Sequence, residues 1–202
     1  MIETVIEMAK KKKEAIPWND IEIEELKYNI KISGFKSYQL ELVDFLENDS
    51  KIQQKQKVNK TYIVRYKPTK QLVGYLTLST ASINVKAGPA FKKEFHDKFK
   101  ELNINYKDLP ALRVGRLCVH DDFVDKGIGT KLVLFSMLKI LEINKHVGCR
   151  FLYLDAKRHD EPKKDSVHFY KKMGFKVYKE RQKGALPMYF DLYHLIDLSE
   201  ST

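Results

Sequence analysis

The stretch LCVHDDFVDKGIGTKLVLFSML, residues 117–138, is the most informative segment of the chain. An apolar strand ends near His120, a polar turn follows, and two glycines, Gly127 and Gly129, open a long apolar helix. Glycine lacks a Cβ atom, so the backbone there can bring its amides close to a ligand. The first amides of a helix have no intrahelical acceptor, and the helix dipole adds partial positive charge beside them. The sequence therefore predicts a strand–turn–helix unit that can hold a phosphate group.

The side chains and the spacing of this turn leave two interpretations open. Lys126 supplies a cation and Thr130 a hydroxyl that fit an anion site. However, G-x-G differs from the P-loop spacing and from the full dinucleotide fingerprint. Taken alone, the turn is equally consistent with a tight strand-to-helix connection that binds no ligand.

Strands and helices follow one another along the rest of the chain. We expect strands at residues 28–33, 61–66, 71–83, 112–120 and 149–156, and two more near the end. We expect helices at residues 38–48, 91–102 and 166–173, besides the helix that the two glycines open. The turn KPTK joins the second and third strands into an antiparallel hairpin. This order predicts an α/β (α+β) domain with a mixed, mostly antiparallel central sheet and helices on both faces.

The composition is that of an ordinary globular chain. Of 202 residues, 43% are hydrophobic and 32% are charged, and no apolar run approaches the ~20 residues of a membrane-spanning helix. The first residues do not follow the pattern of a secretory signal peptide. We expect one domain over residues 1–202, in which 1–26 form an N-terminal helical extension, in the cytoplasm and not at a membrane. The two cysteines, Cys118 and Cys149, predict neither a disulfide framework nor a metal site.

The chain is basic, with a formal net charge of +10. Residues 51–60 carry four lysines and no acid, and residues 163–183 carry eight basic residues against two acids. Such an excess can recruit nucleic acid, phosphorylated small molecules or CoA. It is also consistent with a lysine-rich proteome and no polyanionic partner.

A second segment, FYKKMGF at residues 169–175, makes the pattern specific. Together with LCVHDDFVDKGIGTKL and CRFLYLDA it resembles the acetyl-CoA-binding core of the GNAT superfamily of N-acetyltransferases, over residues 112–180. The resemblance implies a GNAT-like acyl-CoA N-acyltransferase fold, with acetyl-CoA as co-substrate. It implies that Tyr170 lies near the thioester sulfur. It further implies that the strand residues Leu117, Cys118 and Val119 contact the pantetheine arm, and that Val124, Asp125, Lys126, Gly127, Ile128, Gly129 and Thr130 wrap the pyrophosphate.

The loop departs from the family pattern at its beginning. Relatives usually carry Gln or Arg where this chain has Val124, and Asp125 follows as an acid beside a phosphate site. Lys163 and Ser166 stand where many relatives have Asn and Ala. These departures keep a second hypothesis open, in which a degenerate loop belongs to a non-catalytic CoA-binding or protein-interaction module.

A looser resemblance extends over nearly the whole chain. The segments FKSYQLELVDFLENDS, TYIVRY, LVGYLTLS, RVGRLCVH and MYFDL are similar to the GNAT branch that contains tRNA-acetylating toxins. In that branch the acceptor is the amine of an aminoacyl-tRNA, and an antitoxin partner is expected. The segment GFKS, residues 34–37, lacks the cysteine–glycine pair often found there.

The chemistry of amide formation assigns roles to these residues. Tyr170 can protonate the leaving thiolate, and the amide of Val119 can stabilise the oxyanion. No residue stands out as a base, which favours an α-amine acceptor with a pKa of ~7.7–8.0 over lysine. The remaining base candidates are Asp155, Glu94, His96, His120, His159 and His168.

We therefore expect an N-acetyltransferase that moves an acetyl group from acetyl-CoA to a primary amine by direct attack. The acceptor is an aminoacyl-tRNA, a protein or a small amine, and the resemblance also allows a homodimer. A nucleic-acid-binding protein without CoA ranks last, because the chain has no helix-turn-helix or RNA-binding motif.

Overall fold

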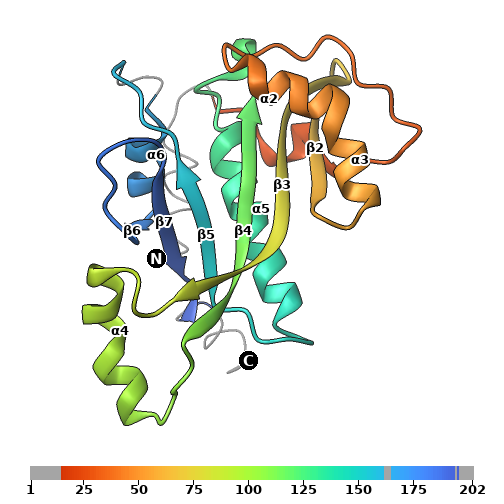
Figure 1. Ribbon diagram of the computed structural model, residues 1–202. Coiled ribbons are helices and arrows are strands. Elements are labelled where there is room, and N and C mark those ends of the chain that lie inside the picture. Colours follow the sequence, from red (N-terminus) through yellow and green to blue (C-terminus); the bar gives the residue numbers. More distant parts are fainter. Residues whose placement is uncertain (1–14, 162–164, 194, 196–202) are drawn as a thin grey trace. The chain divides into compact units, whose positions relative to one another are not determined.

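The structure of the protein, a computed structural model, describes residues 15–161, 165–193 and 195. Seven strands within these residues form one sheet in the order β1-β2-β3-β4-β5-β7-β6 (Figure 1). Contacts divide the chain into two compact units, which are described one at a time. Unit 1 contains Met1–Ser79 and Val114–Ser136, and unit 2 contains Thr80–Arg113 and Met137–Thr202. The expected α/β fold with a mostly antiparallel sheet is confirmed.

Unit 1 combines an antiparallel part of the sheet with helices. Its own elements are η1 (Trp18–Asp20), β1 (Ile21–Glu25), α2 (Leu40–Asp44), the π-helical turn η2 (Phe45–Asp49), α3 (Ser50–Lys55), β2 (Lys60–Tyr66) and η3 (Asp121–Phe123). It also holds the first part of β3 (Gln71–Asn84), the second part of β4 (Asp108–Val119) and the first turns of α5 (Ile128–Ile143). β1 pairs with β2 and β2 with β3, both antiparallel, which confirms the expected hairpin.

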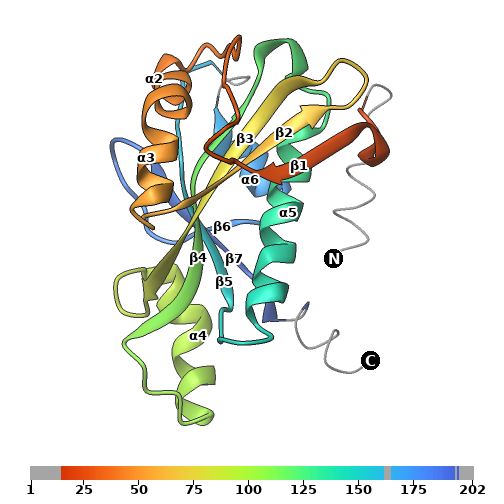
Figure 2. The same cartoon turned by 90° about the vertical axis from the view of Figure 1, so that its right-hand side faces the viewer.

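Two neighbouring residues of β3 show how helices cover both faces of this unit. The Tyr75 hydroxyl donates to the carbonyl of Leu42 in α2 at 2.7 Å. At Gly74, an added Cβ atom would lie 3.1 Å from the side chain of Ile128 in α5 and 3.2 Å from the Cys118 carbonyl. Successive strand residues point to opposite faces, so α2 and the start of α5 lie on opposite sides of the strands (Figure 2). The missing side chain at Gly74 lets α5 approach closely.

Unit 2 is built around an aromatic core. Its elements are α4 (Pro89–Glu101), β5 (Phe151–Ala156), α6 (Ser166–Lys172), β6 (Lys176–Val177) and β7 (Leu186–Asp191), with the remaining parts of β3, β4 and α5. β7 pairs antiparallel with both β5 and β6. The α4 residues Phe91, Phe95 and Phe99 pack against Phe151, Tyr178 and Tyr189. This confirms that the aromatic spacing at 91–102 belongs to a packed helix.

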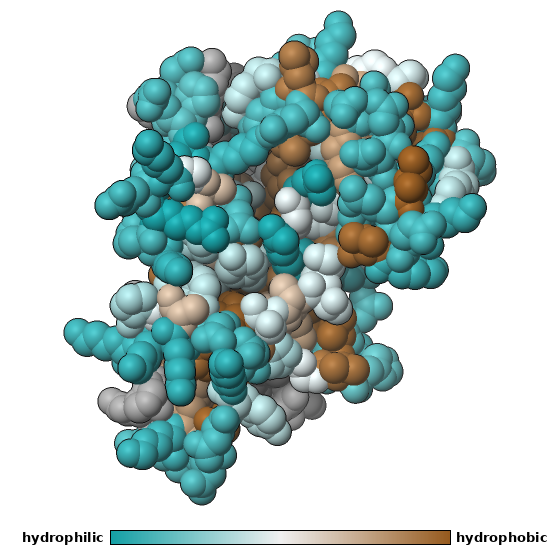
Figure 3. Space-filling model, in the orientation of Figure 1, coloured by the Kyte–Doolittle hydropathy of each residue, from teal (hydrophilic) through white to brown (hydrophobic). Residues whose placement is uncertain are grey.

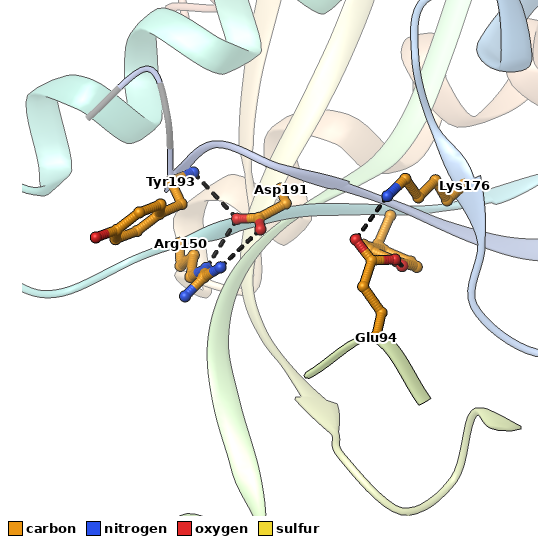
Figure 4. A network of polar contacts seen from close by, with 6 residues as sticks. Glu94, Arg150, Lys176, Asp191 and Tyr193 are labelled. Carbon is orange, nitrogen blue, oxygen red and sulfur yellow. Dashed lines mark hydrogen bonds and ion pairs between the residues drawn. The ribbon is translucent and has the colours of Figure 1, made fainter. Parts of the chain in front are cut away.

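Polar contacts at the ends of this core hold α4 and β7 in place (Figure 4). The Arg150 guanidinium donates to both carboxylate oxygens of Asp191, at 2.8 and 2.7 Å. Asp191 also accepts from the amide of Tyr193. Glu94 of α4 accepts from the Tyr189 hydroxyl at 2.8 Å and pairs with Lys176 of β6 at 2.6 Å.

The beginning of the chain differs from the sequence prediction. Residues 28–33 were expected to be a strand, but the first strand is β1, inside the range expected to be a helical extension. Residues 1–14, the main part of that extension, lie outside the described residues. The helix expected at 38–48 continues through η2 and α3 to Lys55. Within the described part of the chain, no helix is long and apolar enough to cross a membrane.

Candidate functional site

The predicted phosphate loop connects β4 to α5 in unit 1. After η3, residues 124–127 complete the turn, with Asp125 at φ 64° and Gly127 at φ 80°. Glycine adopts this left-handed conformation freely, and Asp tolerates it better than most other residues. The acid at position 125, which departs from the family pattern, therefore suits the backbone of the turn.

The loop ends in the row of backbone amides that opens α5. The first backbone bond of α5 runs from the Lys131 amide to the Gly127 carbonyl at 3.2 Å. The amides of residues 127–130 donate to no acceptor among the described residues. The helix dipole concentrates positive potential at the same place. This geometry can bind an anion through the main chain, whatever side chain stands at Val124.

The strand residues expected at the pantetheine arm lead directly into this loop. Leu117 and Val119 are half-buried, whereas Cys118 is buried against Phe35, Phe45 and Tyr75. Burial raises the pKa of the Cys118 thiol to about 11. The side chain is therefore a protonated thiol at neutral pH, and any contact with a ligand at this position falls to the backbone.

A lysine that the sequence analysis did not select lies beside the loop. Lys131, in the first turns of α5, is 2% exposed, and its ammonium would lie 3.5 Å from a Cβ atom placed at Gly127. It has no hydrogen-bond or ion-pair partner within the described part of the chain, and only the ring of Trp18 faces it, at 5.4 Å from the ring centroid. Burial lowers its pKa. The available signal was its spacing of four residues from Gly127, which places both on one helix face.

Tyr170 belongs to α6 in unit 2. Asp165 caps this helix by accepting from the amide of Val167, and the amide of Phe175 donates to the Tyr170 carbonyl where the helix ends. The rings of Phe169 and Phe175 surround Tyr170 at centroid distances of 5.0 and 5.4 Å. Burial raises the pKa of its hydroxyl. The hydroxyl has no hydrogen-bond partner among the described residues.

Two carboxylates that the sequence analysis offered as bases, Asp155 and Glu94, have hydrogen-bond and ion-pair partners in the structure. Asp155 pairs with Arg113 at 2.8 Å and accepts from the Tyr153 hydroxyl at 3.3 Å. Glu94 is held in the network described above. The geometry therefore gives these carboxylates structural partners.

The histidine candidates do not form a site either. His120 is buried, and both of its ring nitrogens have partners, the Asp122 amide and the Gln71 side chain. His159 accepts from the Glu161 amide, and His168 is exposed. The side chain of His96 lies outside the described residues. None of these contacts identifies a general base.

The GFKS segment is attached to the end of β4 in unit 1. The Asp121 amide donates to the Lys36 carbonyl at 3.0 Å, and the Asp121 carboxylate accepts from the Tyr38 amide at 3.1 Å. The ring of Phe35 packs edge-on against that of His120. This segment, just before α2, is thus fixed to the strand that leads into the phosphate loop.

The two basic segments are partly committed to internal contacts. In residues 51–60, Lys51 donates to the Ile30 carbonyl and Lys60 pairs with Glu25, which leaves Lys55 and Lys57 exposed. In residues 163–183, Lys176 pairs with Glu94. Hydrophilic residues nevertheless cover most of the face drawn in Figure 3.

Comparison with known proteins agrees with the predicted acetyl-CoA-binding core. Residues 59–177 match the family described as acetyltransferase (GNAT) domain. The structure of AtaT complexed with acetyl-methionyl-tRNAfMet has a TM-score of 0.70 and 25% identity, covering 89% of this chain and 99% of AtaT. AtaTR bound with AcCoA has a TM-score of 0.68 and 25% identity, with coverage of 90% and 99%. A mutant of KacT shares the fold, with a TM-score of 0.70 and 23% identity. The match covers 89% of this chain and 99% of KacT.

Proposed function

Because the chain belongs to the GNAT acetyltransferase family, we propose that it moves the acetyl group of acetyl-CoA to a primary amine by direct attack. The observation that carries the proposal is the row of amides at residues 127–130, which donate to no acceptor in the described part of the chain and lie at the positive end of α5. A diphosphate supplies the acceptors that these amides lack. We assign the pyrophosphate to residues 124–130 and the pantetheine arm to the backbone of residues 117–119.

The proposed reaction needs few groups from the protein. The neutral amine attacks the thioester carbon, the carbonyl oxygen gains negative charge, and the thiolate of CoA leaves as the amide forms. The Val119 amide is our candidate donor to the oxyanion. Tyr170 is our candidate acid for the thiolate, because its hydroxyl is protonated and has no partner among the described residues.

The acceptor that we favour is the α-amine of an aminoacyl-tRNA. The complex of AtaT with acetyl-methionyl-tRNAfMet supports this choice, as does the net charge of +10. An α-amine is largely neutral near its pKa of ~7.7–8.0, so it needs little help from a base. That agrees with the structure, in which Asp155, Glu94 and His120 already have hydrogen-bond or ion-pair partners.

The test is transfer of radiolabelled acetyl from acetyl-CoA to total charged tRNA. We expect label in the RNA fraction with the wild-type protein and a loss of roughly a hundredfold in rate with Tyr170→Phe, the scale of general acid catalysis. Tyr106→Phe is the matched control, because Tyr106 is 74% exposed and belongs to the same unit. It should retain the wild-type rate.

The other outcomes separate the alternatives. An unlabelled RNA fraction with label on peptides or small amines would exclude tRNA and leave the acetyltransferase proposal intact. Binding of acetyl-CoA without transfer to any amine would instead support a non-catalytic CoA-binding module. We also propose that residues 1–202 work as a single domain whose acetyl-CoA-binding core is 112–180. We further propose a homodimer and a cytoplasmic location.

A further inference from the structure

The ammonium of Lys131 occupies an unfavourable position in the ligand-free protein. It is buried at the N-terminal end of α5, where the helix dipole already contributes positive potential. A buried cation without a counter-ion carries a desolvation penalty, because it loses its hydration shell. The described residues offer it no carboxylate, and the Trp18 ring supplies only a cation–π contact.

The side chain nevertheless runs toward the loop. Helical side chains tilt toward the N-terminus, so a residue reaches back over the residue four positions before it. Here that residue is Gly127, which has no side chain to block the approach, and the ammonium lies 3.5 Å from the place of its missing Cβ atom. The cation therefore lies beside Gly127, the first residue of the row whose amides donate to no acceptor among the described residues.

The segment before η1 closes the other side of the loop. The Ile16 amide donates to the Lys126 carbonyl at 3.1 Å, and the Ala15 side chain would lie 3.5 Å from a Cβ atom at Gly127. Trp18 follows and covers the ammonium. Residues 15–18 thus lie against both the loop and the Lys131 ammonium.

We propose that Lys131 is the counter-charge for the diphosphate of the coenzyme, completing the anion site that the backbone amides begin. This inference rests on the proposed function, since it names a positioning residue for the same ligand. Binding of the diphosphate would give the buried ammonium an anionic partner, which it does not have among the described residues. Lys131 therefore raises affinity for the coenzyme while it destabilises the ligand-free protein.

Replacement by methionine separates these two effects. Lys131→Met keeps most of the volume and removes the buried charge, so we expect the melting temperature of the ligand-free protein to rise. We expect its dissociation constant for CoA to increase about ten- to hundredfold, as for loss of a charge-assisted hydrogen bond. Lys139→Met is the matched control, because it removes one positive charge from the same helix, where Lys139 pairs with Glu142. That control should change CoA affinity less than about twofold.

The measurements are isothermal titration with CoA and with inorganic pyrophosphate, and thermal denaturation without ligand. Lys131→Gln, a neutral polar variant of similar length, is the second variant and should also lose affinity for both ligands. CoA affinity within about twofold of wild type in both variants, or a ligand-free melting temperature that falls in both, would overturn the inference. A wild-type protein that binds neither acetyl-CoA nor CoA would instead overturn the proposed function.

Discussion

Tyr170, our proposed acid, lies in surroundings that suit one step of the proposed reaction. Its ring lies between those of Phe169 and Phe175, and this burial raises the pKa of the hydroxyl. A phenol with a raised pKa stays protonated over the whole physiological range. It can therefore donate a proton to a leaving thiolate, but it is unsuited to accept one from the attacking amine.

The pH dependence of the proposed reaction follows from two groups, the acceptor α-amine and the Tyr170 hydroxyl. The free α-amine must be neutral, so we expect kcat/KM for transfer to aminoacyl-tRNA to rise between about pH 6 and pH 8.5. Because the Tyr170 pKa is raised above its usual value of ~10, the rate should then stay level up to about pH 10. The measurement is a pH–rate profile under subsaturating substrate. A decline that begins near pH 9 would contradict the assignment of a buried tyrosine as the acid.

The stability of the ligand-free protein should also depend on pH through Lys131. Burial lowers its pKa in the folded state, so the unfolded chain binds more protons and stability rises with pH up to about 10.4. We expect the stability advantage of Lys131→Met over wild type to shrink between about pH 7 and pH 10. Denaturant titrations of both proteins at several pH values measure this difference. A difference that stays constant over that range would mean that the lysine is not strained by burial.

Residue roles were only partly predictable from the sequence. The glycine spacing and FYKKMGF selected the loop and Tyr170, because both depend on local pattern. Lys131 was missed because a lysine in a sequence is expected to be solvated, and its burial beside Trp18 depends on tertiary packing. Asp155 was a candidate base until the structure showed its partner Arg113, far away in the sequence.

The elements of unit 2 depend on contacts that join distant parts of the chain. Arg150, just before β5, forms a bidentate ion pair with Asp191 at the end of β7. Each of the two side chains is 19% exposed. The same guanidinium lies against the rings of Phe99 and Tyr193, at 5.2 and 4.6 Å from their centroids. The pair therefore fixes the end of the β5–β7 ladder beside α4.

Removal of one partner of this pair should be costly. We expect Arg150→Met to lower the free energy of unfolding by about 2–4 kcal/mol, because Asp191 is left with an unpaired charge in a partly buried place. The double variant Arg150→Met with Asp191→Leu should recover part of that loss. Urea denaturation of the single and double variants measures both values. Equal stability of Arg150→Met and wild type would show that the ion pair contributes nothing.

The elements differ from the sequence prediction at residues 28–33, where hydrophobic alternation fits either a strand or an irregular segment buried on one side. Residues 28–33 alternate, and Ile30 and Ile32 do pack on the core of unit 1, but this stretch is irregular and pairs with no strand in the described structure. One-sided burial produces the same pattern as a strand. β1 was missed because its glutamates lower strand propensity, although its pairing with β2 stabilises it. The long regular elements, α4, α5 and β3, were predicted correctly.

At the scale of the whole molecule, charge is the property that bears on the acceptor. The net charge of +10 is divided among many lysines, some of which are held by acids or carbonyls. Lys55 and Lys57, exposed at the end of α3, carry no such contact in the described structure. They are the clearest candidates for phosphate contacts in residues 51–60.

Binding of tRNA should therefore be sensitive to salt and to these lysines. We expect the affinity to fall steeply between about 50 and 200 mM salt, since each neutralised phosphate releases counter-ions. Lys55→Glu with Lys57→Glu should weaken binding and flatten that slope. Lys92→Glu with Lys100→Glu on α4 makes the same change in net charge and is the control. An equal loss in both pairs, measured by filter binding, would assign the effect to net charge alone.

We propose that the chain transfers acetyl from acetyl-CoA to the amine of an aminoacyl-tRNA. The most direct test of this proposal is the release of free CoA thiol, measured with aminoacylated tRNA and with the same tRNA after removal of its amino acid. We expect CoA release equal to the amount of aminoacyl-tRNA added, and only background release with the deacylated tRNA. Release that is the same with both tRNAs, or absent with both, would contradict it.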